Sequence, residues 1–123
     1  MILIDTSVWI DHLRQRDDHL VITLLAGHVL IHPWVIGEIA CGSLKDREQV
    51  LYLLRSLPLC SVALEDEVLL FVEQNKLMTR GIGYVDVHLL ASTKLSGATL
   101  WTRDKRLLII AKEMNIAYPE ILH

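Results

Sequence analysis

The sequence predicts an α/β fold in which a central parallel sheet is covered by helices on both faces. Short apolar runs alternate along the chain with longer amphipathic segments, which is typical of strands that alternate with helices. The chain has 123 residues, enough for one domain with a sizeable core. We therefore expect one domain over residues 1–123, a three-layer α/β/α fold with four to five parallel strands and right-handed crossovers.

The predicted strands are short apolar runs that end at polar residues, glycine or proline. The first run stops at Asp5, and Pro33 closes the second. Runs that stay apolar at successive positions are typical of parallel strands buried on both faces. The runs are residues 1–4, 29–32, 59–62, 98–102 and 116–118.

The helices are predicted from apolar residues at helical spacing and from start and stop signals. Residues 5–7, Asp-Thr-Ser, can cap a first helix whose apolar stripe includes Trp9 and Leu13. Gly27 and Gly97 follow helices that they can terminate. The later helices are expected over residues 18–26, 34–41, 47–57, 65–78, 84–95 and 104–114.

The charge and the cysteines limit the class of protein. Twelve basic and fifteen acidic residues give a net charge of −3, which excludes a basic coat for nucleic acid but still allows a metal-dependent RNA enzyme. On charge alone, an ordinary cytosolic protein without a charged partner is favoured. Cys41 and Cys60 have no metal-ligand spacing and indicate a reducing compartment. Because no signal peptide or membrane-length apolar run is recognised, we expect a cytoplasmic protein.

Four acidic side chains stand where a single site could form. Asp5 follows the first strand, and Asp104 lies two residues after the strand that ends at Thr102. Such positions share one edge of a parallel sheet. Glu38 and Asp86 lie inside apolar helical segments, where a carboxylate is costly unless a charge or a metal meets it. Singly, each acid could be structural, and Asp86 could simply favour the start of its helix; the four together indicate a cation site.

Carboxylate oxygens are the ligands that Mg²⁺ and Mn²⁺ prefer. A bound cation lowers the pKa of water enough to make a nucleophile near neutral pH, and a second cation would stabilise the leaving oxygen at phosphorus. Without a cation, carboxylates at close range raise one another's pKa values. Whether one or two cations bind is left open by the sequence.

Four segments carry these acids in one order. They are Ile4-Asp5-Thr6-Ser7-Val8-Trp9-Ile10, the helix around Glu38, Gly83-Tyr84-Val85-Asp86-Val87-His88-Leu89-Leu90-Ala91-Ser92 and Leu100-Trp101-Thr102-Arg103-Asp104-Lys105-Arg106-Leu107. With them the chain resembles the PIN-domain family, and within it the VapC toxins of bacterial and archaeal toxin–antitoxin pairs. The resemblance implies an endoribonuclease dependent on Mg²⁺ or Mn²⁺, which cleaves RNA, often tRNA or rRNA, by metal-activated water.

The resemblance also implies a role for each residue of the site. Asp5 and Asp86 would be the core metal ligands and catalytic residues, and Glu38 the third acid of the set. Asp104 would be the fourth, at the position that varies most in the family. Thr102 matches a hydroxyl position near the site and could orient a ligand or water.

Basic, aromatic and histidine side chains give weaker signals. Arg80, Arg103 and Arg106 could hold RNA phosphates, although solvated helix ends are the alternative. The tryptophans could stack on bases, but beside apolar runs they are more often core or interface residues. They are Trp9, Trp34 and Trp101. His88 points about 200° away from Asp86 on a helix, which favours a partner contact or a core hydrogen bond over metal binding. The other histidines are expected to be structural or to lack ligand spacing: His12, His19, His28, His32 and His123.

Partners are predicted from the apolar composition and from the resemblance. Hydrophobic residues make up 52% of the chain, and the mean hydropathy is +0.38. We therefore expect a homodimer through apolar helix faces such as residues 9–13 or 85–89. The resemblance adds an RNA substrate and a VapB-type antitoxin, whose Arg or Lys side chain would enter the acidic pocket.

Two other function classes fit parts of the pattern. A phospho-receiver signalling domain has similar length and α/β alternation, but it needs an acid pair after the first strand, where Thr6 follows Asp5. It also needs a lysine near the position that Arg103 occupies. A catalytically silent binding module of the PIN fold is the third alternative, and the complete set of four acids argues against it.

Overall fold

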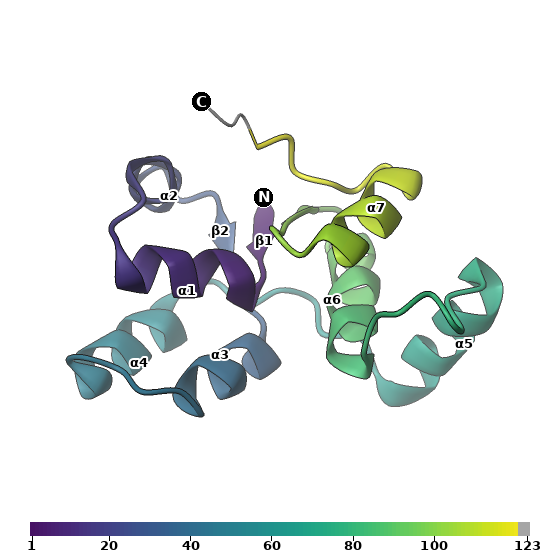
Figure 1. Cartoon of the computed structure of the whole chain (residues 1–123), viewed down its shortest axis with the longest axis horizontal. Coiled ribbons are helices and arrows are strands. Elements are labelled where there is room, and N and C mark those ends of the chain that lie inside the picture. The colour runs from purple at the N-terminus through teal and green to yellow at the C-terminus, as the bar shows by residue number, and fades with distance from the viewer. Residues whose placement is uncertain (121–123) are drawn as a thin grey trace.

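The computed structural model describes residues 1–120 of the chain, which form three strands and seven helices (Figure 1). The order of the elements is β1 (Ile2–Ile4), α1 (Thr6–Arg14), α2 (Asp18–Leu25), β2 (Val29–Leu30), α3 (Pro33–Ala40), α4 (Arg47–Ser56), α5 (Glu65–Asn75), α6 (Tyr84–Leu95), β3 (Thr99–Trp101) and α7 (Lys105–Glu113). Strands alternate with helices as the sequence predicts, and the α/β class is confirmed.

Strand β1 is the centre of a parallel sheet with the order β2-β1-β3. Ile2 lies opposite Val29 on one side and opposite Thr99 on the other. Every residue of β1 and β2 is buried, because helices cover both faces of a sheet made of parallel strands. In Figure 1, α1 to α4 gather on one side of β1 and α5 to α7 on the other, which gives the predicted three layers.

The predicted sheet of four to five strands is wrong for residues 1–120, which contain three. The segment after α4 contributes only one parallel bridge, from Leu59 to Ile31. Beyond it, the backbone N–H groups of Ser61 and Ala63 donate to side-chain hydroxyls of the α6 C-cap and of α6 instead of to a strand, at 2.9 and 3.0 Å. The ladder at this edge therefore stops after one residue.

The opposite edge is shortened for a different reason. Ala117 forms a single bridge to Leu100 of β3, with hydrogen bonds from Leu100 N–H to Ile116 and from Tyr118 N–H to Leu100. The next residue is Pro119, which has no N–H to continue the ladder. Both predicted edge strands exist as bridges that extend the sheet by one residue each.

The helix boundaries follow the sequence closely, and the largest difference is at α5. This helix ends at Asn75 rather than at residue 78, because Lys76 adopts a left-handed conformation with φ of 52° that terminates it. Gly81 follows with φ of +80°, and a Cβ there would lie 2.9 Å from the Arg106 guanidinium. Glycine is thus required where the chain turns toward α6.

The core takes up part of both predicted dimer faces. Trp9 in α1 and Leu89 in α6 are almost fully buried, and they pack with the other apolar side chains of the chain itself. Leu13 is exposed and Val85 is half-buried, so a dimer through these faces stays a prediction. Within residues 1–120, no helix combines the length and the apolar character that crossing a membrane requires.

Candidate functional site

The four predicted acids come from elements that meet at the carboxyl edge of the sheet. Asp5 joins β1 to α1, and Asp104 is the N-cap of α7 after β3. β1 leads to β2 on one side while β3 lies on the other, the arrangement in which open α/β sheets form their sites. The N-termini of α1 and α7, with their positive dipole ends, lie beside these carboxylates.

Asp5 is the buried member of the set, with 4% of its surface exposed. It caps α1 by accepting hydrogen bonds from the backbone N–H and the hydroxyl of Ser7, and its other oxygen accepts one from the Thr102 hydroxyl. Burial raises the pKa of Asp5, and these hydrogen bonds offset part of the rise. The side chain is therefore fixed in orientation and energetically costly to hold as a bare anion.

Thr102 links two of the acids. Its hydroxyl donates to Asp5 Oδ2 and accepts from the backbone N–H of Asp104 at 3.1 Å. Asp104 itself is exposed and accepts a hydrogen bond from Leu107 N–H at 3.0 Å as the cap of α7. One buried hydroxyl thus sets the spacing between the ends of β1 and β3.

Asp86 lies within electrostatic reach of the other three carboxylates. It lies half-buried in the first turn of α6 and accepts a hydrogen bond from Gly83 N–H at 3.3 Å. Its pKa is raised first by burial and further by the negative charges of Asp104, Asp5 and Glu38. The four predicted acids are therefore close enough for their charges to act on one another.

Glu38 differs from the prediction, because it is exposed rather than core-facing. Val35 and Ile39 are buried and define the inner face of α3, and Glu38 is rotated by about 80° from the middle of that face. Its carboxylate accepts a hydrogen bond of 2.7 Å from the Thr6 hydroxyl. This contact ties α3 to the start of α1 and holds Glu38 at the rim of the acidic cluster.

The donor chemistry of the cluster fits a hard, hydrated cation. Within residues 1–120, no three His, Cys, Asp or Glu side chains stand close enough to form a ready-made metal cage. Mg²⁺ usually binds proteins through one or two carboxylates and keeps several waters, so it does not need such a cage. Asp5 and Asp86 are the carboxylates whose burial gives them most to gain from a cation.

The predicted phosphate-binding arginines are mostly engaged elsewhere. Arg103 forms ion pairs of 2.6 to 2.8 Å with acids of α1, the α2 cap and the C-terminal segment. Arg80 pairs with Glu113 at 2.9 Å. Arg106 is exposed and donates to the carbonyl of Gly81 at 3.3 Å. The acidic partners of Arg103 are Asp11, Asp17 and Glu120.

Beside the acids lies a group of rings that the sequence did not predict as a unit. We call His32, Trp34, Tyr84 and His88 the aromatic cluster. The Trp34 and His88 centroids are 4.1 Å apart, and those of Tyr84 and His88 are 5.1 Å apart. His88 packs here, as its predicted direction away from Asp86 implies. The signal available in the sequence is that Trp34 precedes Glu38 by four residues and Tyr84 precedes His88 by four, a spacing that puts each pair on one helix face.

The other aromatic and histidine residues follow the prediction. Trp9 and Trp101 are core residues. His32 is structural, since its Nδ1 accepts the Trp34 N–H and caps α3. His123 lies outside the described residues.

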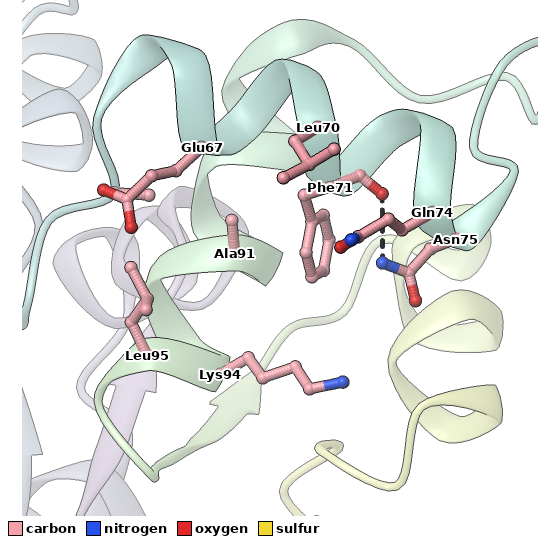
Figure 2. A pocket seen from close by; sticks show the side chains of 9 residues that line it. Glu67, Leu70, Phe71, Gln74, Asn75, Ala91, Lys94 and Leu95 are labelled. Carbon is pink, nitrogen blue, oxygen red and sulfur yellow. Dashed lines mark hydrogen bonds between the residues drawn. The ribbon is translucent and has the colours of Figure 1, made fainter.

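A groove between α5 and α6 stands apart from the acidic cluster (Figure 2). Phe71 and Leu70 of α5 face Ala91 and Lys94 of α6 across a volume of 320 Å³. None of the four acids lines it, so it is not the acidic site.

Comparison with known proteins adds three findings. A family model described as the PIN domain matches residues 2–113. A protein named Ribonuclease VapC32, from two strains of Mycobacterium tuberculosis, is 50% identical over 121 residues, which cover 98% of each chain.

The third finding concerns solved structures. FitAcB from Neisseria gonorrhoeae is similar with a TM-score of 0.62, 21% identity and 95% of both chains covered. FitAB bound to an IR36 DNA fragment has a TM-score of 0.63, 21% identity and full coverage of both chains. At this identity, these structures support the fold alone.

Proposed function

Because the chain belongs to the PIN-domain family, we propose that it is a metal-dependent endoribonuclease whose active site is the acidic cluster. The observation that carries the proposal is that Thr102 joins Asp5 to the N–H of Asp104 at the carboxyl edge of the sheet, with Asp86 within electrostatic reach of both acids. The relative named as a ribonuclease is half identical over nearly the whole chain, which supports RNA as the substrate.

In this proposal, Asp5 and Asp86 would hold Mg²⁺ or Mn²⁺. A bound cation would supply Lewis acidity, lowering the pKa of water and offsetting charge at the phosphodiester. Thr102 and Ser7 fix the Asp5 carboxylate by hydrogen bonds. These contacts hold one ligand in its working orientation before any substrate arrives.

The two exposed acids have a different part. Glu38 and Asp104 lie at the rim of the cluster, where water reaches them. Each can accept a hydrogen bond from a water that approaches the phosphodiester, and so orient it or take its proton. Their position, rather than burial, suits them to this task.

Electrostatics supports a role for a cation in this proposal. The chain carries a net charge of −3, and the proposed site contains four carboxylates. They would repel an RNA phosphate. A divalent cation at Asp5 and Asp86 would neutralise the charge of these two carboxylates and so weaken the repulsion.

The test is a cleavage assay with purified protein. Total RNA is incubated with the wild-type chain in Mg²⁺, in Mn²⁺ or in EDTA, and the new RNA ends are mapped by sequencing. We expect discrete new ends only in the presence of a divalent cation. Equal cleavage in EDTA would contradict the metal-dependent site, and absence of cleavage under every condition would favour a catalytically silent binding module.

We further propose that the chain is the toxin of a toxin–antitoxin pair, with a VapB-type antitoxin as its partner. A cluster of carboxylates attracts an Arg or Lys side chain, which can compete with the cation and block the site.

We also propose a homodimer. Its interface would use exposed apolar residues of one helix face, such as Leu69 and Leu70 of α5.

A further inference from the structure

The aromatic cluster is built in two layers. His32 and His88 are buried, whereas Trp34 keeps 38% and Tyr84 42% of its surface exposed. The Trp34 ring lies 4.1 Å from His88 and 5.7 Å from Tyr84, measured between centroids. Buried imidazoles therefore support two larger rings whose remaining surface is open to solvent.

Trp34 connects the aromatic cluster to the acidic cluster. Trp34 and Glu38 are four residues apart in α3 and thus share a face of that helix. Tyr84 lies on the face of α6 opposite Asp86, with His88, and its ring joins the cluster through Trp34, at 5.7 Å between centroids. An RNA strand that reaches Glu38 therefore meets the Trp34 ring on the same helix face, with Tyr84 behind it.

His32, at the base of the cluster, is uncharged at neutral pH. His32 Nδ1 accepts the backbone N–H of Trp34 at 3.0 Å, which requires an unprotonated Nδ1. Burial and the neighbouring His88 lower the pKa of His32 to about 4. Neutral rings do not attract phosphate, but they offer flat surfaces that suit an uncharged planar ligand.

We propose that Trp34 and Tyr84 form a stacking subsite for a nucleobase of the RNA strand, beside the phosphodiester that the acidic cluster cleaves. This inference rests on the proposed ribonuclease function. Proteins recognise single-stranded RNA largely by stacking splayed bases on aromatic side chains. The subsite would position the strand and favour cleavage in unpaired regions, where bases are free to stack.

A nucleobase fits these rings better than a protein partner does. A stable protein interface buries roughly 800 Å² on each side, far more than two half-exposed rings provide. Exposed apolar residues suited to a second copy of the chain lie elsewhere, such as Leu69 and Leu70 of α5. The aromatic cluster is small, and its Trp34 ring shares a helix face with Glu38, as a single-base subsite would.

The experiment compares binding of two RNA probes in the Asp5→Asn background, which prevents cleavage. One probe is a short single-stranded oligoadenylate, and the other has the same length but carries abasic riboses. Trp34→Leu and Tyr84→Leu should each weaken oligoadenylate binding by roughly 5- to 150-fold, the usual loss for one stacked base. Both variants should leave binding of the abasic probe unchanged, because it contains nothing to stack.

Two further variants serve as controls. Trp34→Phe keeps an aromatic ring and should retain most of the preference for the oligoadenylate. Tyr52→Leu removes an exposed ring of α4 that lies outside the cluster and should change neither affinity. Circular dichroism and melting temperatures check that each variant is folded.

The possible outcomes separate the inference from the function on which it rests. If wild-type protein cleaves RNA but the Leu variants bind both probes as the background protein does, the stacking subsite is wrong and the ribonuclease stands. An equal loss on both probes, or a change of oligomeric state by sedimentation, would assign the rings to structure or to a protein interface. If the wild type does not cleave RNA, the function fails and the subsite fails with it.

Discussion

The hydroxyl of Thr102 donates a hydrogen bond to Oδ2 of Asp5 across 97 positions of sequence. Both side chains are buried, with 3% and 4% of their surfaces exposed. The contact closes the gap between the ends of β1 and β3 and, through the N–H of Asp104, sets the start of α7. The orientation of Asp5 therefore depends on a residue that carries no charge.

Replacing Thr102 tests this dependence. Thr102→Val keeps the shape but leaves Oδ2 of Asp5 without its hydrogen-bond donor, and should cost about 1–3 kcal/mol of folding free energy. RNA cleavage should fall as well, because the carboxylate loses its fixed orientation. Thr102→Ser keeps the hydroxyl and should preserve most activity. Urea denaturation and cleavage rates measure both effects, and a Val variant as active as wild type would remove Thr102 from the site.

Neutralising the acids should stop cleavage without unfolding the chain. Asp5→Asn and Asp86→Asn should each lower the cleavage rate by at least about a hundredfold, since a cation supplies several kcal/mol of transition-state stabilisation. Glu38→Gln should also be damaging, and Asp104→Asn milder. The matched control is Asp18→Asn at an exposed surface acid, which should cleave normally. Wild-type rates for either of the first two variants would refute the assignment.

Adding a cation should stabilise the fold. A ligand that binds only the folded state contributes about 2.7 kcal/mol at one hundred times its dissociation constant, so Mn²⁺ should raise the melting temperature by several degrees. Asp5→Asn should blunt that rise. Differential scanning fluorimetry with an EDTA control measures it. A melting temperature indifferent to millimolar Mn²⁺ would argue strongly against cation binding.

Without a cation, the buried carboxyl group of Asp5 should make the protein less stable as pH rises. Burial raises the pKa of Asp5, so the folded state binds this proton more tightly than the unfolded chain. Its contribution to stability is then present at low pH and lost as pH rises through the raised value. In EDTA, Asp5→Asn should flatten this loss, and the variant should be at least as stable as wild type at neutral pH.

His32 should make the stability of the fold depend on pH in the opposite direction to Asp5. Its pKa in the folded state is about 4, below the ordinary 6.5, so the unfolded chain binds more protons between these values. Stability should fall as pH drops from about 6.5 to about 4. His32→Asn keeps a good helix cap and should show less of this fall, whereas His28→Asn at an exposed position should not. Denaturant titrations at several pH values compare the slopes.

The toxin proposal is tested in cells. Expression of the wild-type chain alone should stop bacterial growth, and co-expression of the neighbouring antitoxin gene should restore it. The Asp5→Asn chain should be harmless yet still co-purify with the antitoxin. Normal growth at high wild-type expression in a host without the antitoxin would rule out the toxin role but not the ribonuclease.

The sequence predicted the parts of the fold that depend on neighbours in the chain. The bounds of α6, residues 84–95, were predicted as they stand, because Gly83 and Gly97 flank a continuous apolar helix. Asp5 and Asp104 were placed at strand ends for the same local reason. Both lie at N-caps, where short polar side chains have a strong local preference.

Contacts between residues that are far apart in the sequence could not be predicted from such local patterns. Glu38 was expected to face the core, since its neighbours are apolar, but the partner that holds it is Thr6. Arg103 was expected to face phosphate, yet three acids brought together only by folding surround it. The aromatic cluster likewise forms between helices α3 and α6. A local sequence pattern does not predict which two helices come into contact.

Asp5, Asp86 and Asp104 each accept a backbone N–H at the start of a helix, a task that asparagine performs as well as aspartate. A single base change converts an aspartate codon to an asparagine codon. In the lineage of this chain, silencing the chemistry and losing the fold are therefore separate events, and the first is one mutation away. One mutation of this kind can give a descendant that keeps the fold and the partner surfaces but has lost catalysis.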